Sequence, residues 1–247
     1  MSSNALYTDL SGYYDLMCAD IDYRQQSHGI SRLHTIFGNS GRRHLDLACG
    51  TGPHVWHFVD LGYQSRGLDI NAPMLDIARA RCPQAEFSVQ NMCDFALAQP
   101  VDLITCFLYS IHYSATLEQL QACIQCVHQA LTEQGVFCFN AVDKNTIDNQ
   151  LSVRHSATHD NNYFEFESCW NYAGAGDAQA LQLRISKTTA GVTQTWQDAH
   201  AMVAVSFEQL RQLLLPYFEV HILEHDYSAV LPWLSVSGNA IFVCIKR

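Results

Sequence analysis

The stretch from Arg42 to Trp56 reads RRHLDLACGTGPHVW and decides the fold of the chain. Its first half, residues 43–48, is a short apolar segment typical of a buried β-strand. Small residues then form a turn, Cys49–Gly52, and Pro53 opens a helix at a position where its missing N–H has no intrahelical partner to lose. Glycines after a strand let the backbone approach a ligand closely, and the helix start offers unpaired N–H groups to an electron-rich partner. The stretch therefore predicts a nucleotide-binding turn.

The size and composition of the chain are those of a globular protein with a full core. Its 247 residues suit one large domain or a domain with a modest insertion, and 48% of them are apolar. No apolar run is long enough to span a bilayer, and the first residues, MSSNALYTDLSGYYD, lack the pattern of a signal peptide. We therefore expect a soluble, cytoplasmic protein that does not bind a membrane.

The net charge and the cysteines indicate which kinds of binding partner and metal site to expect. The formal net charge is −10, and Lys and Arg form no block. Because a nucleic-acid binder needs a basic surface to neutralise phosphates, a small-molecule partner is favoured over nucleic acid. The ten cysteines are scattered and are expected to be reduced, mostly buried side chains. Cys123 and Cys126 share one face of a predicted helix, which indicates packing rather than a metal site.

Downstream of the turn, strand-like and helix-like segments alternate with short connections. This rhythm predicts right-handed crossovers and a parallel sheet. The expected strands cover residues 43–48, 64–69, 85–89, 101–107, 135–140, 217–225 and 238–246. The expected helices cover residues 53–61, 72–81, 116–131 and, after a capping box at Ser206, residues 206–216. The sequence therefore predicts an α/β fold with a Rossmann-like, seven-stranded, mostly parallel sheet and helices on both faces.

Two further regions depart from this rhythm. The N-terminal region contains two tyrosine clusters and a helical stretch, and is expected to cap the main domain. Residues 163–172, 180–189 and 192–204 alternate in polarity around glycine turns, which predicts about three inserted antiparallel strands, whereas the polar segment 145–160 is expected to be a mobile connection. The expected domains are a helical cap (1–40), a core (41–144 with 205–247) and an antiparallel insertion (145–204).

The ends of the predicted strands indicate a nucleotide site, because ligands of open parallel sheets bind beyond the carboxyl ends of the strands. Asp69 ends the second strand about twenty residues after the glycines, where a carboxylate can accept both hydrogens of a ribose diol. Alternatively, Asp69 has a structural role and caps the next helix. After the third strand, Asn91 can bond an exocyclic amine and Met92 can cover an adenine face, unless they are simply turn and core residues.

The fourth strand ends in FLYSIHY, residues 107–113, where a substrate group is expected opposite the cofactor. His112 suits a general base because the pKa of a free histidine lies near neutrality, although a lone histidine is more often a hydrogen-bonded structural residue. His54 and His57 share one helix face, but a metal would need a third ligand and a supporting shell. We expect them to be structural, and we expect no metal.

The series LDLACGTG, GLDIN, VQNMCDF, VDLITCF and ALTEQGVFCFNA resembles the motifs of class I S-adenosylmethionine-dependent methyltransferases over residues 43–143. A closer likeness is to bacterial small-molecule methyltransferases with a tyrosine-rich cap and an inserted antiparallel sheet, including sugar N,N-dimethyltransferases. Tyr14-Asp15 and Asp22-Tyr23 resemble the leader pattern of that group. Gln197-Asp198-Ala199-His200 and Phe207-Glu208-Gln209-Leu210 resemble its late pattern.

Carried over by position, the resemblance implies S-adenosylmethionine as the cofactor. It implies cofactor contacts from Tyr14, Tyr23, Asp46, Ala48, Gly50, Thr51, Gly52, Asp69, Ile70, Met74, Asn91, Met92 and Phe107. The methionine moiety would lie near Ala48, Gly50 and Gly52, the ribose on Asp69, and the adenine between Ile70 and Met92. The catalytic candidates are His112, Tyr113 and Tyr14.

Two departures from the family pattern bear on function. Asn91 stands where an acidic residue usually holds the adenine amine, so the hydrogen bond is kept without the charge. The Asn-Pro-Pro-Tyr or Asp-Pro-Pro-Tyr motif of enzymes that methylate nucleobase amines is missing after the fourth strand, which argues against DNA as acceptor.

The expected function is transfer of a methyl group to a nitrogen, or less readily an oxygen, of a small metabolite. A nicotinamide-dependent oxidoreductase is an alternative, weakened by the lack of a Tyr-x-x-x-Lys donor set. A cofactor-binding protein without catalysis is another. The sequence leaves open the acceptor and whether the protein is a monomer or a homodimer.

Overall fold

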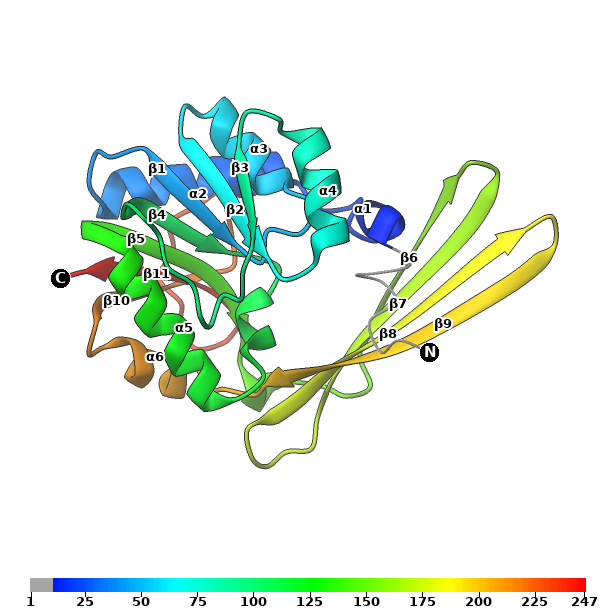
Figure 1. The fold of residues 1–247 in the computed structure, drawn as a ribbon. Helices are drawn as coiled ribbons and strands as arrows, with labels where there is room; N and C mark the ends of the chain where they lie inside the picture. The colour runs from blue at the N-terminus through cyan, green and yellow to red at the C-terminus, as the bar shows by residue number, and fades with distance from the viewer. Residues whose placement is uncertain (1–10) are drawn as a thin grey trace.

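The computed structural model of the protein describes residues 11–247. Figure 1 shows a seven-stranded sheet flanked by helices and a four-stranded sheet that projects away from it. No helix within residues 11–247 combines the length and apolarity needed to cross a membrane.

The larger sheet has the strand order β10-β11-β5-β4-β1-β2-β3. Its strands are β1 (Arg43–Leu47), β2 (Gln64–Asp69), β3 (Glu86–Val89), β4 (Val101–Cys106), β5 (Leu131–Val142), β10 (Phe218–Glu224) and β11 (Asn239–Lys246). All pairs are parallel except those of β11, which runs antiparallel to β5 and β10. The predicted mostly parallel, seven-stranded Rossmann-like sheet is confirmed. Strand order reverses between β1 and β4, so a crevice is expected at their carboxyl ends.

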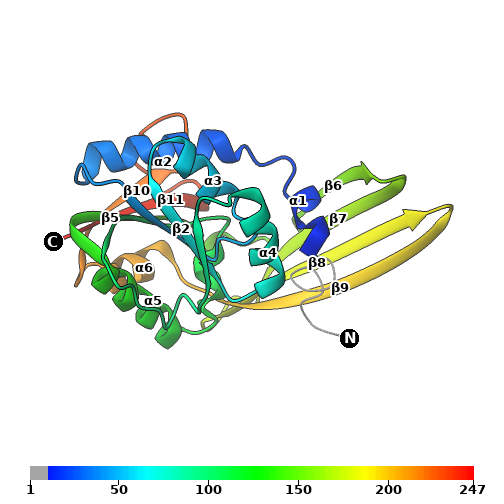
Figure 2. The same ribbon diagram turned by 45° about the horizontal axis from the view of Figure 1, so that its top comes forward.

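Helices cover both faces of this sheet (Figures 1 and 2). One group comprises α2 (Tyr23–Phe37), α3 (Pro53–Asp60) and α4 (Ala72–Arg81), and the other comprises α5 (Leu117–Ala130) and α6 (Phe207–Leu214). Strand β5 illustrates why both faces of the sheet need a covering layer: successive side chains of a strand point to opposite faces. Phe137 and Phe139 pack in the cluster that contains residues of α5 and α6, whereas Val136 and Cys138 pack in the cluster that contains residues of α2.

The smaller sheet has the order β6-β7-β8-β9 and is antiparallel throughout. Its strands are β6 (Ser152–His159), β7 (Asn162–Tyr172), β8 (Ala178–Thr189) and β9 (Val192–Val203). The expectation that residues 145–160 form a mobile connection is wrong for β6. As an edge strand, β6 exposes most of its side chains, so its sequence is polar while its backbone is held by pairing with β7. The insertion therefore has four strands instead of about three.

A short helix, α1 (Tyr14–Met17), lies between the two sheets (Figures 1 and 2). Tyr13 and Tyr14 pack against the apolar cluster of the smaller sheet, where Phe164 and Phe166 are buried. The next helix, α2, instead packs on the larger sheet beside α3. The proposed division into cap, core and insertion stays a prediction, and residues 1–10 of the cap lie outside the described residues.

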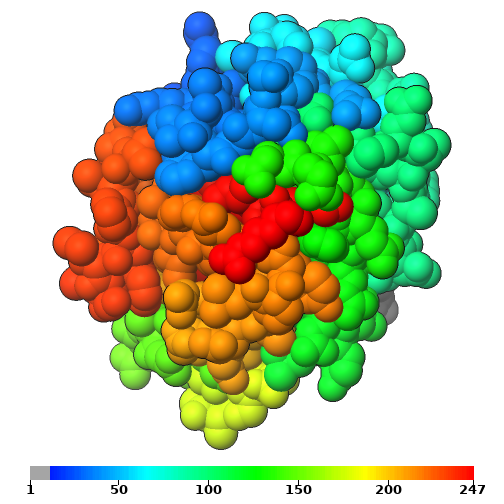
Figure 3. Space-filling model, turned by 90° about the vertical axis from the view of Figure 1, so that its left-hand side faces the viewer, coloured from blue at the N-terminus to red at the C-terminus, as the bar shows by residue number. Residues whose placement is uncertain are grey.

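The end of the molecule that carries the C-terminus is shown in Figure 3. The last strand, β11, lies there between segments of the N-terminal part and of the α6–β10 part, and its residues 240–245 are buried. The opposite edge of the sheet, where β1, β2 and β4 end, faces α1 and the smaller sheet.

Candidate functional site

A cavity of about 370 Å³ lies at the carboxyl ends of β1, β2 and β3, beneath α1 and beside β9. This volume is in the range of small-molecule sites, and the position is where an open parallel sheet places its ligands. Its lining residues are Tyr14, Ala48, Gly50, Leu68, Asp69, Ile70, Asn71, Met74, Gln90, Asn91, Met92, Ser110, Tyr113, Ala199, His200 and Ala201. Both sheets and the cap thus contribute to one cavity.

The glycine-rich turn forms one wall of this cavity. Gly50 has φ +54° and Gly52 has φ +76°, both in the left-handed region that glycine adopts without steric cost. A Cβ at Gly50 would stand 3.1 Å from Cε of Met74 and 4.0 Å from the ring of Tyr14. The missing side chain therefore leaves a cradle between α4 and the cap. Gly52 instead lies against Ala78 and Phe87, and it does not line the cavity.

Asp69 holds the turn and faces the cavity. Its Oδ2 accepts the backbone N–H of Gly50 at 2.9 Å, and its Oδ1 accepts the backbone and side-chain N–H groups of Asn71 at 2.8 and 3.1 Å. Burial raises the pKa of Asp69, while these hydrogen bonds oppose the rise. A carboxylate offers about four lone-pair positions, so acceptor capacity remains for a ligand hydroxyl.

The opposite wall of the same region is flat and largely apolar. Ile70 has 65% of its surface exposed, and Met92 is buried at the far side of the cavity. Between them, Oδ1 of Asn91 accepts the N–H of Cys93 at 2.9 Å, which closes the turn after β3. The turn alternative predicted for Asn91 is therefore present, and the side chain still lines the cavity.

A narrow pocket extends inward from the turn. It is lined by Tyr14, Tyr23, Asp46, Ala48, Cys49, Gly50, Pro53, His54, Phe107, Leu108 and Ser110. The hydroxyl of Tyr23 is buried beside the thiol of Cys18 and meets no other hydrogen-bonding group within residues 11–247. Because a thiol is a weak partner, this orphan hydroxyl can also pair with a polar ligand group in the pocket. His54, expected to be structural, is hydrogen-bonded through Nε2 to Gln26 at 2.9 Å.

A string of buried polar side chains lies beneath this pocket on the α2–α3 face of the sheet. Oγ1 of Thr105 donates to Oδ1 of Asp46 at 2.6 Å and pairs with Nε2 of His44 at 2.8 Å. Nδ1 of His44 pairs with Oγ of Ser65 at 2.6 Å. A hydroxyl has one hydrogen, so Thr105 accepts from Nε2–H of His44, and Ser65 donates to Nδ1. Burial raises the pKa of Asp46 to about 7.

Thr51 links the cap to the glycine-rich turn through hydrogen bonds. Its hydroxyl donates to Oδ1 of Asp15 in α1 at 2.7 Å and accepts from Nη1 of Arg81 in α4 at 2.8 Å. Arg81 also pairs with the second oxygen of Asp15. Thr51 is fully buried and does not line the cavity, so the structure gives it a different place from the cofactor contact that was expected.

His112 is not in the cavity either. Its Nδ1 lies 2.9 Å from the carbonyl oxygen of Val203, and its Nε2 accepts the backbone N–H of Val142 at 3.1 Å. The ring is fully buried, and burial lowers its pKa to about 4. With both nitrogens bonded to backbone groups, His112 joins β5 and β9. This is the position of a structural residue, and it differs from the catalytic position that was expected for His112.

Tyr113, the next residue, does line the cavity. Its Oη lies 2.7 Å from Nδ1 of His200, which comes from β9 and is itself part of the lining. Nε2 of His200 faces Oδ2 of Asp198 at 4.0 Å, and both side chains are nearly fully buried. The role of His200 was missed, although its segment had been noted for its likeness to the family; no local pattern indicates that β9 reaches the carboxyl end of β4.

The loop after β4 that presents these groups is strained. Leu108 and Tyr109 have φ of +53° and +60°, an unfavourable conformation for residues with a side chain. The N–H of Tyr109 donates to Oδ1 of Asn140 at 3.0 Å. Such strain gathers at functional sites, where the surrounding structure holds it in place. In this loop, the strained conformation of Leu108 and Tyr109 places Ser110 where it lines both the cavity and the inner pocket.

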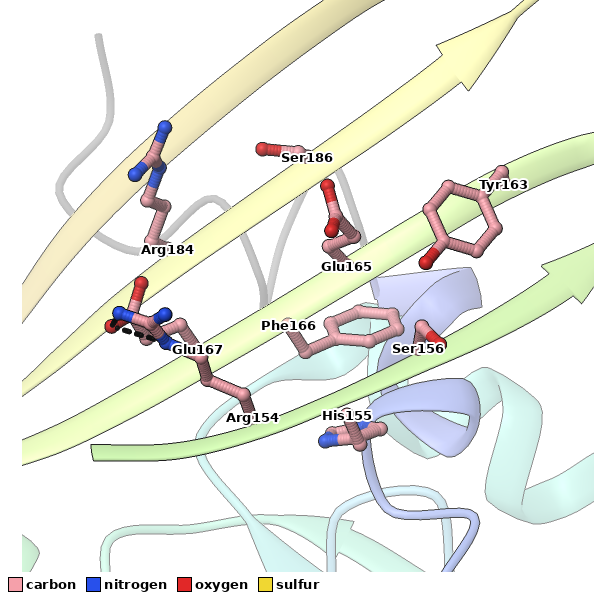
Figure 4. Close-up of a pocket in the computed structure, with 9 residues that line it drawn as sticks. All are labelled: Arg154, His155, Ser156, Tyr163, Glu165, Phe166, Glu167, Arg184 and Ser186. Carbon is pink, nitrogen blue, oxygen red and sulfur yellow. Dashed lines mark hydrogen bonds and ion pairs between the residues drawn. The ribbon is translucent and has the colours of Figure 1, made fainter.

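A second cavity, of about 410 Å³, lies on β6, β7 and β8 of the smaller sheet (Figure 4). Its most evident contact is the pair of Arg154 with Glu167, at 2.9 and 2.6 Å, and Arg154 is largely exposed. Exposed ion pairs of this kind contribute little to binding or stability. None of the predicted site residues lines it.

The structure thus brings most of the predicted cofactor residues together. The cavity at the carboxyl ends of the strands contains Tyr14, Ala48, Gly50, Asp69, Ile70, Met74, Asn91, Met92 and Tyr113, and the inner pocket adds Tyr23, Asp46 and Phe107. Thr51, Gly52 and His112 lie outside both. Within residues 11–247, no group of three or more metal-ligating side chains is placed to hold a metal ion.

The chain is similar to known proteins both in sequence and in fold. Residues 45–135 match the methyltransferase domain family. A dTDP-3-amino-3,6-dideoxy-α-D-glucopyranose N,N-dimethyltransferase of Streptomyces fradiae is 34% identical over 104 residues, which are 42% of this chain and 41% of that protein. The aligned region spans about two fifths of the length of such curated sugar N,N-dimethyltransferases.

Two solved structures share the whole architecture. DesVI of Streptomyces venezuelae superposes with a TM-score of 0.84 at 23% identity, covering 97% of this chain and 99% of that chain. S-adenosylmethionine-bound CalS10, an amino pentose methyltransferase of Micromonospora echinaspora, superposes with a TM-score of 0.79 at 17% identity, covering 93% of each chain. At these identities the likeness shows a shared fold.

The fold and the site define a class I methyltransferase architecture, with the glycine-rich turn at its cofactor end. The predicted resemblance is confirmed: residues 45–135 match the methyltransferase domain family, and the chain shares the fold of solved methyltransferases. The sequence relatives of this domain include sugar N,N-dimethyltransferases.

Proposed function

We propose that the chain is an S-adenosylmethionine-dependent N-methyltransferase whose acceptor is the amine of a small amino sugar. The observation that carries the proposal is the continuity of one cavity. It is lined by Asp69 and the glycine turn and also by Ser110, Tyr113 and His200. A cofactor and an acceptor can therefore meet there.

The residues present fit the cofactor. The orphan hydroxyl of Tyr23 and the cradle at Gly50 provide a place for the amino-acid end, with the carboxyl group of Asp46 nearby. Asp69 has acceptor capacity for the ribose hydroxyls, and Ile70, Asn91 and Met92 line the region expected for the adenine. When bound, S-adenosylmethionine supplies a methyl group on a positively charged sulfur, which is already strongly electrophilic.

The contribution of the protein is then mainly one of position. Tyr14 of α1 lies over the cavity, beside the turn, and offers an electron-rich ring to a cation. Tyr113 and Ser110, held by the strained loop after β4, face the same space and would orient the acceptor nitrogen. Fixing two reactants in line replaces a bimolecular encounter by a nearly unimolecular step, which is the largest gain available here.

Calorimetry and a methylation assay test the proposal. We expect S-adenosylmethionine and S-adenosylhomocysteine to bind, and we expect mass shifts of one or two methyl groups on dTDP-3-amino-3,6-dideoxy-α-D-glucopyranose, the substrate class in the name of the relative from Streptomyces fradiae. A matched sugar nucleotide with a hydroxyl in place of the amine separates nitrogen from oxygen acceptors. Absence of cofactor binding would overturn the proposal.

The two alternative functions give different results in the same assays. A nicotinamide-dependent oxidoreductase would bind NADH and not S-adenosylhomocysteine. A binding protein without catalysis would bind S-adenosylhomocysteine yet leave every amine in a broad panel unmethylated. We further propose that the protein acts in the cytoplasm as a monomer or homodimer and that its acceptor is not a nucleic acid, for which the net charge of −10 is unfavourable.

A further inference from the structure

Three side chains from two distant segments meet beside the cavity, and two of them, Tyr113 and His200, line it. Tyr113 comes from the turn after β4, η3 (Ser110–Ser114), whereas Asp198 and His200 come from β9. Asp198 and His200 are two positions apart in a strand, so their side chains point to the same face of the sheet. Oη of Tyr113, the imidazole of His200 and the carboxylate of Asp198 therefore follow one another, with separations of 2.7 and 4.0 Å.

The direction of the hydrogen bond between Tyr113 and His200 follows from the position of Asp198. A neutral imidazole carries its hydrogen on one nitrogen, and Asp198, which lies 4.0 Å from Nε2 and beyond hydrogen-bond distance, favours the hydrogen on Nε2 through its negative charge. Nδ1 is then an acceptor, and the phenol of Tyr113 donates to it. A phenol oxygen that donates its hydrogen keeps lone pairs, and Tyr113 lines the cavity.

We propose that Tyr113, His200 and Asp198 form a proton relay that removes the proton of the acceptor ammonium. This inference rests on the proposed function. Tyr113 is the catalytic residue of the relay, since its oxygen touches the acceptor, and His200 is the group on which the proton comes to rest. Asp198 is a positioning residue that stabilises the charged imidazole.

Proton transfer through the relay breaks two bonds and forms two. The N–H bond of the ammonium breaks, its electron pair stays on the nitrogen, and the proton bonds to Oη of Tyr113. The phenolic O–H bond breaks at the same time, and that proton bonds to Nδ1 of His200. One positive charge moves from the acceptor nitrogen to the imidazole, beside Asp198. The freed lone pair on the nitrogen is the nucleophile for methyl transfer, and the proton returns to solvent after the product leaves.

The other ionisable groups of the cavity are less suited to this step. Tyr14 and Asp69 line the cavity as well, but Asp69 already accepts three N–H groups at the cofactor end. His112, one residue before Tyr113, has both nitrogens bonded to backbone groups and does not reach the cavity. Burial lowers the pKa of His200, so its imidazole is neutral near pH 7, and the charge of Asp198 limits the loss of basicity.

The first test uses nitrogen NMR of the full chain labelled on histidine, and it needs no acceptor. At pH 8 we expect a neutral His200 with hydrogen on Nε2 and none on Nδ1, and His200→Gln identifies the signals. Tyr113→Phe should move the Nδ1 resonance, because it removes the donor. A hydrogen on Nδ1 in the wild-type protein, or a His200 that stays charged at pH 8, would overturn the relay.

The second test is the pH profile of methylation of dTDP-3-amino-3,6-dideoxy-α-D-glucopyranose. General base catalysis contributes roughly 10²- to 10⁴-fold, so His200→Gln should lower kcat by about 10²-fold or more at pH 7. The deficit should shrink as the pH approaches the pKa of the amine, because the acceptor then arrives deprotonated. Asp198→Asn should shift the acid limb of the profile to lower pH, since it removes a carboxylate that raises the pKa of His200.

His221 provides a matched control, because it also pairs with a carboxylate, Glu219, at 3.0 Å, on β10 outside the cavity. His221→Gln should leave rate and pH profile unchanged. A loss in His200→Gln that is equal at every pH would show a positioning role and overturn the relay. A wild-type protein that binds no S-adenosylhomocysteine would instead overturn the proposed function, and the NMR result would still decide the hydrogen-bond arrangement.

Discussion

The carboxylate of Asp69, at the end of β2, accepts the backbone N–H of Gly50 at 2.9 Å. This contact joins the two strand ends on either side of the cofactor cavity and fixes the glycine turn in its left-handed conformation. The same carboxylate faces the cavity, so its two oxygens both shape the turn and remain available to a ligand.

Replacing Asp69 by Ala should weaken binding of S-adenosylhomocysteine by about 10- to 100-fold, because the loss of a charged hydrogen-bond acceptor typically costs about 1.5–3 kcal/mol. Isothermal titration calorimetry measures the change. Asp76→Ala is the control, since Asp76 is an exposed carboxylate on α4 that pairs with Arg79. Equal affinities of both variants and the wild type would contradict the ribose contact.

The second prediction concerns Thr51, whose hydrogen bonds hold α1 of the cap over the cavity. Thr51→Val removes the hydroxyl that bonds Asp15 and Arg81, and Asp15 is the neighbour of Tyr14 over the cavity. Losing hydrogen bonds to charged partners costs about 1.5–3 kcal/mol, so S-adenosylhomocysteine should dissociate about 10- to 100-fold faster in stopped-flow experiments. Thr188→Val, which removes an exposed hydroxyl pair on β8, should have no effect. A dissociation rate that Thr51→Val leaves unchanged would show that α1 does not retain the cofactor.

Much of the fold could be predicted because its signals are local. Residues 64–69 and 72–81 were expected as a strand and a helix, and β2 and α4 have those bounds. Burial on both faces gives central strands continuous apolar runs, and proline and capping residues mark the helix starts. Strand β6 was missed because an edge strand is specified by its neighbour: pairing with β7 holds a segment whose own side chains are mostly polar and exposed.

The wall of the cavity that contains the turn and Asp69 was predictable for the same reason, since both belong to one continuous strand–helix–strand unit. The wall that contains Tyr113 and His200 was not. His200 lies 87 positions from Tyr113, and only the path of β9 back to the larger sheet brings them together. His112 was assigned a catalytic role from the pKa of a free histidine, whereas its neighbours Val142 and Val203 engage both nitrogens.

The revised role of His112 predicts a loss of stability without a loss of cofactor binding. His112→Ala leaves the N–H of Val142 and the carbonyl of Val203 buried without these partners, which should lower the free energy of unfolding by about 2–4 kcal/mol. Urea denaturation measures this, with the exposed His28→Ala as the control. Affinity for S-adenosylhomocysteine should change by less than about threefold, since a shift in stability of the folded state does not by itself alter the site.

The pKa of His112 also fixes the sign of a pH effect. Its pKa in the folded protein, about 4, is below the ordinary value of 6.5, so the stability that the neutral ring provides is present above pH 6.5 and is lost as the pH falls toward 4. His112→Gln, which cannot take up a proton, should unfold with a smaller pH dependence in this window. An unchanged pH dependence would mean that His112 is not kept neutral by burial.

Asp46 should affect the pH dependence of stability in the opposite direction, so that its contribution is lost as the pH rises. Its pKa is raised from 3.8 to about 7, so the folded protein favours the protonated carboxyl group. The corresponding stability is complete below pH 3.8 and is lost as the pH rises through 7. Asp46→Asn keeps a carbonyl acceptor for Thr105 and cannot ionise, so its stability relative to the wild type should increase between pH 4.5 and pH 8 by a few kcal/mol, at about 1.4 kcal/mol per pKa unit.

Urea unfolding at several pH values measures this difference, and any constant cost of the Asn side chain cancels because only the change with pH is compared. Asp102→Asn is the contrasting case, since Arg43 and neighbouring donors hold the pKa of Asp102 below its ordinary value. Its stability relative to the wild type should fall, not rise, as the carboxyl group of the wild type ionises with increasing pH. Parallel pH profiles for the two variants would contradict the assignment of a protonated carboxyl group to Asp46, and with it the neutral character of the polar string beneath the cofactor pocket.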